Sequence, residues 1–412
     1  MAPLQSSTKV SLIALTSLGV GVAISSLALR RRRQVNQHRI DQQHDDDENS
    51  HHHERFSSRT TGTEITSNYG REYCCSENNP GQQNEQLLLY VITGATSGLG
   101  LETAKHLSTL TNVYIILGCR DCSLGNTIAK KLTNSNSSGN SKSSNVECIH
   151  LDLTNFTSVK SFASSVLSTV KRLGVPIHGL IHNAGIYGLP GTTNDGYQIT
   201  FQTNILSPAL LTELLLPYTS EDCRVVHVSS KMMKMIWNST RKEGRVFPPV
   251  DGGGSDWDYA LSKACQGLHA LELNIRFASE NNINTNNNED GESSMGRTNQ
   301  RRAFAIEPGL VQTNISRHLH SWVRRLNYFL LSPIVKTIDE GTATTLFCLL
   351  APPDHLDTTD TTYTKKEEDD CVKPYYFAEC KAEVPPRCCR CKDDAMIQGE
   401  VFMEILQPYL WN

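Results

Sequence analysis

The sequence predicts an α/β fold with a doubly wound parallel sheet, and two observations support this prediction. From Leu87 onward, short apolar runs rich in β-branched residues alternate with segments whose apolar residues recur at helical spacing. A glycine-rich turn joins the first apolar run to the first helical segment. Alternating strands and helices favour βαβ units, in which helices cover both faces of a parallel sheet.

The glycine-rich turn, Thr93–Gly100 (TGATSGLG), follows the apolar run Leu87–Ile92 and precedes a predicted helix over 101–110. Glycine permits positive φ and close approach of the backbone to a ligand, and a helix start offers unpaired N–H groups to an anion. This order predicts a site for a nucleotide pyrophosphate. Because the glycines are spaced more widely than in G-x-G-x-x-G, the prediction needs support from motifs downstream. The glycines are Gly94, Gly98 and Gly100.

The remaining predicted elements follow along the chain. Polar inserts fall between them, where a longer loop costs little closure entropy, and we predict that they are solvated loops. The inserts lie near 134–145, 280–300 and 352–370. We predict strands over 113–117, 146–151, 177–182, 224–229 and 302–306, and helices over 126–132, 158–170, 202–216 and 259–277.

Residues 1–33 are predicted to form a membrane anchor. Val10–Leu29 carries no charge, is long enough to cross a bilayer as a helix, and is followed by Arg30–Arg33. A cleaved secretory signal is the alternative, but its apolar core would be shorter and its positive charge would come first. The arginines place the following chain in the cytosol. Residues 34–86 are predicted to be a disordered polar linker, and residues 87–412 a single folded domain.

Charge and cysteine content argue against two classes of site. The formal net charge is −4, which does not indicate a nucleic-acid-binding protein. The 13 cysteines are scattered without a regular framework. Cys388 and Cys391 form a C-x-x-C, but a zinc site would require a second pair at suitable spacing. No metal site is therefore predicted.

Tyr259 and Lys263 are the pair with the clearest chemical meaning. They lie four residues apart at the start of a predicted helix, so both side chains share one face. A nearby ammonium favours the phenolate and lowers the pKa of a tyrosine from about 10. Tyr259 could then exchange a proton with a substrate oxygen, and Ser230, at the end of a predicted strand, could donate to that oxygen. Alone, a tyrosine and a lysine at this spacing are more often an ordinary pair on a helix surface. The surrounding motifs therefore decide whether the pair is catalytic.

Together the motifs resemble the short-chain dehydrogenase/reductase superfamily and, within it, the retinol-dehydrogenase-like branch. The resemblance covers about residues 87–381 and implies a Rossmann-type sheet in one catalytic domain. It implies that Asn204, Ser230, Tyr259 and Lys263 are catalytic, with Tyr259 as general acid or base and Asn204 in a water-linked proton relay with the lysine. Glu307 departs from the pattern, because histidine is common there. The motifs are Thr93–Gly100, Asp152–Leu153, His182–Gly185, Asp195–Tyr197, Phe201–Asn204, Val228–Ser230, Tyr259–Lys263 and Pro308–Gly309.

The end of the second predicted strand determines the expected cofactor. Arg120 can pair with a 2′-phosphate there, whereas an acidic residue would accept the ribose 2′-hydroxyl of NAD. We therefore predict NADP, while Asp121, one position later, keeps NAD as an alternative. The predicted cofactor-binding residues, several of them implied by the resemblance, are Gly94, Thr96, Ser97, Gly98, Leu99, Gly100, Arg120, Asp152, Leu153, Asn183, Ala184, Gly185, Tyr259, Lys263, Pro308, Gly309 and Thr313.

The expected function is NADP-dependent interconversion of a lipophilic alcohol and its aldehyde or ketone, with a retinoid, sterol or fatty aldehyde as substrate. An apolar stretch that includes Trp322 and Phe329 could collect such a substrate from the bilayer. The alternatives are a pigment-intermediate reductase of the same superfamily and an NADP-binding membrane scaffold or sensor without turnover. The resemblance favours the endoplasmic reticulum membrane, with a mitochondrial or plastid membrane as alternatives. The sequence does not predict the oligomeric state.

Overall fold

The computed structural model describes most of the predicted domain and a short segment before it. Of the helices in these described ranges, none combines the length and the apolar character that crossing a membrane requires. The predicted anchor lies outside the described residues, as do Thr313, Trp322, Phe329 and the C-x-x-C cysteines. The described residues are 56–74, 86–135, 145–238, 256–286, 300–311, 335–357, 375–383, 385, 389 and 392–411.

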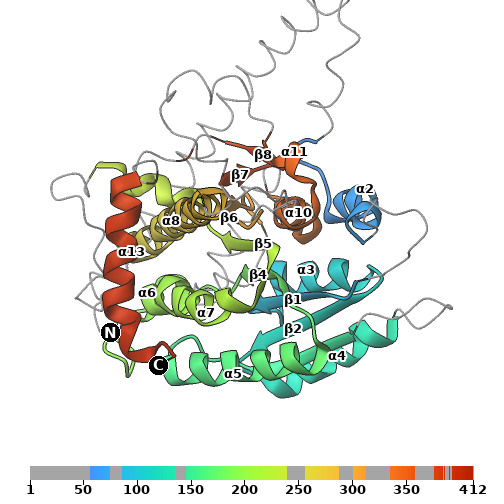
Figure 1. Cartoon of the computed structure of the whole chain (residues 1–412), viewed down its shortest axis with the longest axis horizontal. Helices are drawn as coiled ribbons and strands as arrows, with labels where there is room; N and C mark the ends of the chain where they lie inside the picture. The colour runs from blue at the N-terminus through green and yellow to red at the C-terminus, as the bar shows by residue number, and fades with distance from the viewer. Residues whose placement is uncertain are drawn as a thin grey trace, which may run out of the picture.

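Within the described chain, eight strands form one sheet in the order β3-β2-β1-β4-β5-β6-β7-β8 (Figure 1). The pairs from β3 to β7 are parallel, and β8 pairs antiparallel with β7. The order 3-2-1-4-5-6 is that of the Rossmann-type doubly wound fold, so the predicted fold class is confirmed. The strands are β1 (Leu88–Thr93), β2 (Val113–Cys119), β3 (Asn145–His150), β4 (Ile177–His182), β5 (Thr219–Val228), β6 (Arg302–Glu307), β7 (Tyr376–Ala378) and β8 (Lys381–Ala382).

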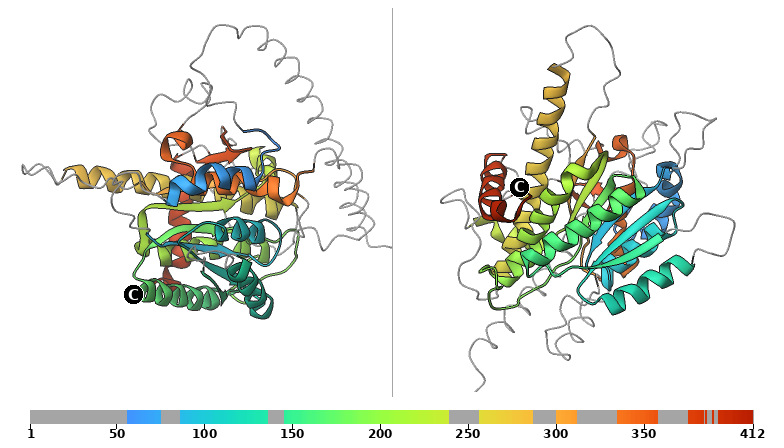
Figure 2. Two further views of the ribbon diagram at one scale, coloured as in Figure 1. Left: turned by 90° about the vertical axis from the view of Figure 1, so that its right-hand side faces the viewer. Right: turned by 60° about the horizontal axis from the view of Figure 1, so that its bottom comes forward.

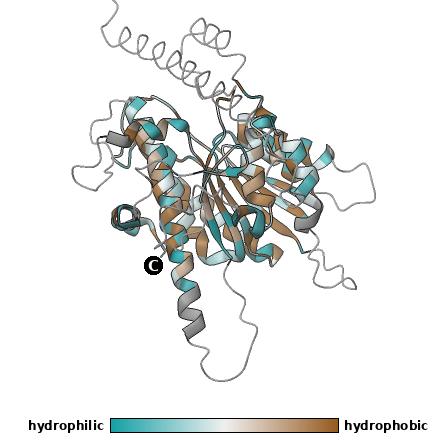
Figure 3. Cartoon of the chain, turned by 90° about the horizontal axis from the view of Figure 1, so that it is seen from above, coloured by the Kyte–Doolittle hydropathy of each residue, from teal (hydrophilic) through white to brown (hydrophobic). Residues whose placement is uncertain are grey.

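The helices cover both faces of the sheet, and each face has its own apolar core. On β1, Leu89 and Val91 belong to a core shared with α5, α7, α8 and α13, whereas Tyr90 and Ile92 belong to a core shared with α2, α3 and α10. Successive strand residues point to opposite faces, so the apolar run of β1 serves both cores. Figure 3 shows the apolar strands between the helical layers. The helices bounding these cores are α2 (Gly62–Cys74), α3 (Gly98–Ser108), α5 (Phe156–Leu173), α7 (Ser207–Leu215), α8 (Asp256–Asn286), α10 (Ile338–Leu350) and α13 (Lys392–Leu406).

Shorter elements complete the fold and place the site residues. A π-helix, η1, links α6 to α7, and the 3₁₀ helix η3 follows β5 directly. The predicted helix over 202–216 is therefore divided into several pieces. The remaining elements are α4 (Cys122–Ser135), α6 (Ile199–Phe201), η1 (Gln202–Leu206), η2 (Leu216–Tyr218), η3 (Lys231–Asn238), α11 (Pro353–Asp357) and η7 (Gln407–Tyr409).

Helix α2 lies within the segment for which the sequence predicts a disordered linker. Its start is a capping box: the N–H of Glu64 donates to Thr61 Oγ1, and the N–H of Thr61 donates to Glu64 Oε2. Ile65 and Tyr69, four residues apart, are buried against α10 and α3. A short amphipathic face is enough to order this segment once a partner surface is present. Figure 2 shows α2 beside α10, and also shows α8 running on into the predicted insert after residue 280.

Candidate active site

The glycine-rich turn has the backbone geometry that a phosphate cradle requires. Gly94 and Gly98 have φ of 66° and 59°, a region that costs other residues about 1–2 kcal/mol. Helix α3 begins at Gly98, and its N-cap Ser97 makes no side-chain capping hydrogen bond. The first N–H groups of the helix are thus not capped by Ser97, and with the positive end of the helix dipole they suit an anion. Thr96 and Leu99, which are also predicted to bind the cofactor, lie in the same turn.

Asn183 fastens the turn to the end of β4. Its Nδ2 donates to the carbonyls of Thr93 and Gly94 at 3.0 and 3.1 Å. The backbone N–H groups of Asn183 and Ala184 both donate to Thr93 Oγ1 at 3.1 Å. A Cβ on Gly94 would lie 2.8 Å from Ala184 Cα, and a Cβ on Gly100 would lie 2.2 Å from Asn183 Nδ2. The structure therefore brings together the glycine turn and the predicted Asn183–Gly185 motif.

Five further predicted cofactor residues that the structure describes follow β2, β3 and β6, at the same carboxyl edge of the sheet. Arg120 is exposed directly after β2, and Asp121 Oδ1 accepts from the N–H of Leu124 at 3.0 Å as the cap of α4. Asp152 follows β3, and its Oδ1 accepts from the N–H and hydroxyl of Thr154. Leu153 is buried. Pro308 and Gly309 follow β6, and Gly309, with φ of 82°, lies against the aliphatic stem of Lys336.

Tyr259 and Ser230 meet at the start of α8. Tyr259 is 6% exposed, and Ser230 lies near enough to lower the pKa of its hydroxyl. The neighbouring Ser229 points the other way, because its hydroxyl donates to the carbonyl of Lys263 at 3.0 Å. Of the two adjacent serines, Ser230 is therefore the one that faces the tyrosine.

Lys263 and Asn204 approach the same point from α8 and η1. A Cβ on Gly185 would lie 3.4 Å from Asn204 Oδ1 and 3.5 Å from Lys263 Nζ. Lys263 Nζ donates to the carbonyl of Val228 at 2.8 Å and lies 5.4 Å from the centroid of the Tyr259 ring. The four predicted catalytic residues are thus gathered around the end of β4 and β5. The shared position supports the predicted set, and the roles of its members remain predictions.

Burial gives Tyr259 and Lys263 pKa values that differ from the expectation based on their spacing. Burial raises the pKa of Tyr259 to about 12, against a lowering by the hydrogen bond from Ser230. Burial also lowers the pKa of Lys263 to about 7. The sequence predicted that the lysine would lower the tyrosine pKa, but the loss of solvent around both groups dominates. At neutral pH Tyr259 carries its proton and Lys263 is close to its midpoint.

Asn204 lies in the π-helix, and its side-chain atoms and its carbonyl all form hydrogen bonds. Its Oδ1 accepts from the N–H of Ile186, and its Nδ2 donates to the carbonyl of Ile186 and to Ser262 Oγ. Its own carbonyl accepts from Gln266 Nε2 at 2.8 Å. Wide helical turns of this kind occur often at functional sites. Here the turn ties the loop after β4 to α8.

Three further residues adjoin the site and were not predicted. Tyr187 packs edge-on against the Tyr259 ring, with centroids 4.8 Å apart, and its hydroxyl donates to Asp256. Gln266 lies one turn after Lys263 and accepts from its Nζ at 3.3 Å. Spacing of three residues from Lys263 could have indicated Gln266, whereas Tyr187 and Asp256 meet only through the tertiary fold.

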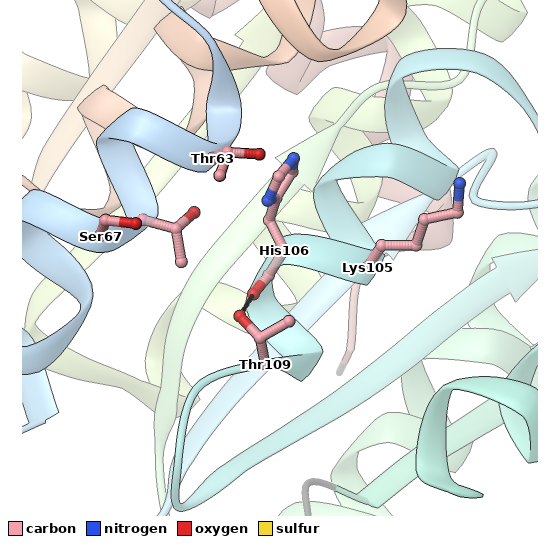
Figure 4. A pocket seen from close by; sticks show the side chains of 6 residues that line it. Thr63, Ser67, Lys105, His106 and Thr109 are labelled. Carbon is pink, nitrogen blue, oxygen red and sulfur yellow. Dashed lines mark hydrogen bonds between the residues drawn. The ribbon is translucent and has the colours of Figure 1, made fainter. Parts of the chain in front are cut away.

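A separate hollow lies between α2 and α3, and it shares no residue with the predicted site (Figure 4). Thr63 and Ser67 line it from α2, Lys105 and His106 line it from α3, and Thr109 lines it from the C-cap of α3. His106 Nε2 is hydrogen-bonded to Asp339 at 2.7 Å, which ties α3 to α10. Because this hollow shares no residue with the predicted site, we do not place the catalytic chemistry there.

Known proteins similar to this chain agree with the motifs. The family profile described as short chain dehydrogenase matches residues 89–241. Human retinol dehydrogenase 12 (Homo sapiens) is 32% identical over 267 residues, which cover 63% of this chain and 72% of that protein. A chicken (Gallus gallus) WW domain-containing oxidoreductase is 31% identical over 269 residues, covering 63% of this chain and 58% of that protein. The chain thus spans less than two thirds of the latter relative. A solved structure of NADPH-bound carbonyl reductase from chicken fatty liver has 18% identity and a TM-score of 0.47, covering 73% of this chain and 100% of that chain.

These findings define the class of the protein. The chain belongs to the short-chain dehydrogenase/reductase superfamily, a class of NAD(P)-dependent oxidoreductases. The retinol dehydrogenase relatives place it in the retinol-dehydrogenase-like branch, which confirms the resemblance drawn from the sequence. The glycine turn, which a Cβ at position 94 or 100 would crowd, fits a nicotinamide dinucleotide as cofactor.

Proposed function

We propose that this protein is an NADP-dependent oxidoreductase that interconverts a lipophilic alcohol and its aldehyde or ketone, with Tyr259 as general acid or base. One observation carries the proposal. Tyr259 and Lys263 are buried beside Ser230 and Asn204 at the carboxyl end of the sheet, next to the glycine turn. Buried ionisable groups with shifted pKa values at such a place are typical of a catalytic site.

The protonation states at neutral pH suit carbonyl reduction. With a pKa raised to about 12, the Tyr259 hydroxyl keeps its proton and can donate it to a carbonyl oxygen that becomes an alcohol. Ser230, which lies beside Tyr259, can orient the same oxygen. Lys263, with a pKa lowered to about 7, can pass a proton toward Tyr259. A bound nicotinamide supplies or accepts the hydride.

Two neighbouring side chains support NADP over NAD. Arg120 is exposed after β2, where it can pair with a 2′-phosphate. The carboxylate of Asp121 is engaged as the cap of α4, so a role in holding the ribose 2′-hydroxyl would cost that cap. Turnover with NADH at equal efficiency would contradict this part of the proposal.

Exposed apolar side chains close in sequence to the proposed catalytic residues support a lipophilic substrate. Met235 on η3, Trp257 on α8 and Leu310 after Gly309 are 38%, 37% and 43% exposed. They lie within five residues of Ser230, Tyr259 and Gly309 in the sequence. We propose a retinoid, sterol or fatty aldehyde as substrate, and an anchor at residues 10–29 that holds the domain on the cytosolic face of the endoplasmic reticulum or another membrane.

A substrate panel tests the proposal. Purified protein is assayed with NADPH and with NADH against retinal, a steroid ketone and long-chain aldehydes, by loss of nicotinamide absorbance. We expect turnover with NADPH, and Tyr259→Phe should lower kcat by about 10²- to 10⁴-fold while NADPH is still bound.

The outcomes separate the alternatives. Tight NADPH binding without turnover on any substrate would favour a scaffold or sensor. Turnover that survives Tyr259→Phe would contradict the role of this tyrosine.

A further inference from the structure

Glu307 is a buried carboxylate that ends β6 and is paired on both oxygens. Its side chain is 2% exposed, and Oε1 accepts from Lys231 Nζ at 2.8 Å. Oε2 accepts from the hydroxyl of Tyr376 at 2.8 Å, and Lys234 Nζ lies 3.6 Å from the same oxygen. A carboxylate is stable in such a place only when it is paired and hydrogen-bonded. The chain therefore gives the Glu307 carboxylate a defined set of partners.

The sheet brings this charge next to Ser230. The N–H of Ser229 donates to the carbonyl of Ile306 at 2.8 Å, so the end of β6 lies beside the two serines. Lys231 follows Ser230 in the chain and begins η3. In a 3₁₀ helix, residues three apart lie on one side, which explains why Lys231 and Lys234 both face Glu307.

The first turn of η3 determines how Ser230 is held. Ser230 Oγ accepts from the N–H of Met232 at 3.2 Å, and its carbonyl accepts from the N–H of Met233 at 3.2 Å. The ion pair between Lys231 and Glu307 fastens this turn to β6. A change in the ion pair would therefore move the serine that faces Tyr259.

We propose that Glu307 is a positioning residue, which holds the first turn of η3 through Lys231 and so fixes the hydroxyl of Ser230 against Tyr259. This inference rests on the proposed function. Tyr376, by donating to the second oxygen, sets the orientation of the carboxylate. Misplacement of a reacting group by about 1 Å can cost about 100-fold in rate, so a residue that touches no substrate can control turnover.

Glu307→Gln keeps the size of the side chain and removes the charge that pairs with Lys231. We expect kcat to fall about 10- to 100-fold with KM for NADPH unchanged, and Glu307→Asp to recover part of the loss. In a Ser230→Ala background, Glu307→Gln should change kcat by less than about twofold, because residues that act through one group are not additive. Hydrogen exchange of the peptide containing Met232 and Met233 should be faster in Glu307→Gln.

The matched control is Glu272→Gln on α8, which removes another buried, paired carboxylate, 3.3 Å from Arg276. It should lower the melting temperature and leave kcat within twofold of wild type. A full additional loss from Glu307→Gln in the Ser230→Ala background, or unchanged hydrogen exchange at Met232 and Met233, would overturn the proposal. If the wild type shows no turnover, the proposed function fails, and the exchange measurement alone decides whether Glu307 holds η3.

Discussion

The two halves of the proposed active site are held together by different physical means. The cofactor half, between β1, α3 and β4, uses neutral hydrogen bonds from Asn183 and glycines packed against backbone. The catalytic half, between β5, β6 and α8, uses buried ionisable groups, namely Tyr259, Lys263 and Glu307. The cofactor half should respond to added side-chain volume and little to pH. The catalytic half should respond to pH and little to added volume.

The largest effect expected from this comparison is on Lys263. Burial lowers its pKa in the folded state to about 7 from the ordinary value of 10.5. Above pH 7 the folded protein therefore binds fewer protons than the unfolded chain, and stability rises with pH until the unfolded lysine also titrates. In Lys263→Met this contribution is absent.

Urea unfolding of the two proteins between pH 6 and pH 9 measures it. The free energy of unfolding of wild type minus that of Lys263→Met should be flat below pH 7 and then rise by up to about 1.4 kcal/mol per pH unit. Other titrating groups cancel in the difference. Parallel curves from pH 6 to pH 9 would show that Lys263 is not buried in the way described.

The cofactor half is probed by volume. Gly94→Ala places a Cβ 2.8 Å from Ala184 Cα at a φ of 66°, and we expect the Kd for NADPH to rise about 100-fold, a loss of about 2.7 kcal/mol. Gly174→Ala is the matched control, because Gly174 has a φ of 69° but nothing within 4 Å of the added Cβ.

Both variants carry a similar backbone cost, so only the crowding differs between them. Fluorescence titration with NADPH at pH 6 and pH 8 should give the same loss at both values. A similar loss of affinity in Gly174→Ala would mean that backbone strain, and not the cradle, is responsible.

The smallest effect is expected outside both halves, at α2. Thr61→Ala removes a capping box and should cost about 1 kcal/mol, which appears as about fivefold faster hydrogen exchange in residues 62–74. Cofactor affinity and kcat should not change, because α2 packs against α10 and α3 and its capping box shares no residue with the proposed site. A change in kcat would connect α2 to the catalytic half.

The same division explains what could be predicted from the sequence. The glycine turn, Asn183 and the pair of Tyr259 and Lys263 are dictated by local needs, such as positive φ or helical spacing, and these needs are visible in short motifs. Glu307 was visible only as a departure from the family pattern, because its partners Lys231 and Tyr376 come from other parts of the chain. The raised pKa of Tyr259 was not foreseen, since spacing along a helix does not show how deeply a side chain is buried.

Helix α2 was missed for another reason. Its capping box at Thr61 and Glu64 and the pair Ile65 and Tyr69 are present in the sequence, but polar tracts on both sides hide them. The surface offered by α10 and α3 makes this short amphipathic helix stable.

Because of the π-helix at Gln202–Leu206, the number of residues in this helical segment helps to determine the geometry of the site. A single π turn accommodates one residue more than an α-helical turn would, and each residue of an α-helix accounts for about 100° of rotation. The extra residue therefore rotates, about the helix axis, the direction in which every later side chain points. Phe201 before the turn and Leu210 and Leu214 after it all reach the same core, while Asn204 inside it faces Gly185. The position of the asparagine is thus set by the number of residues that surround it as well as by their identity.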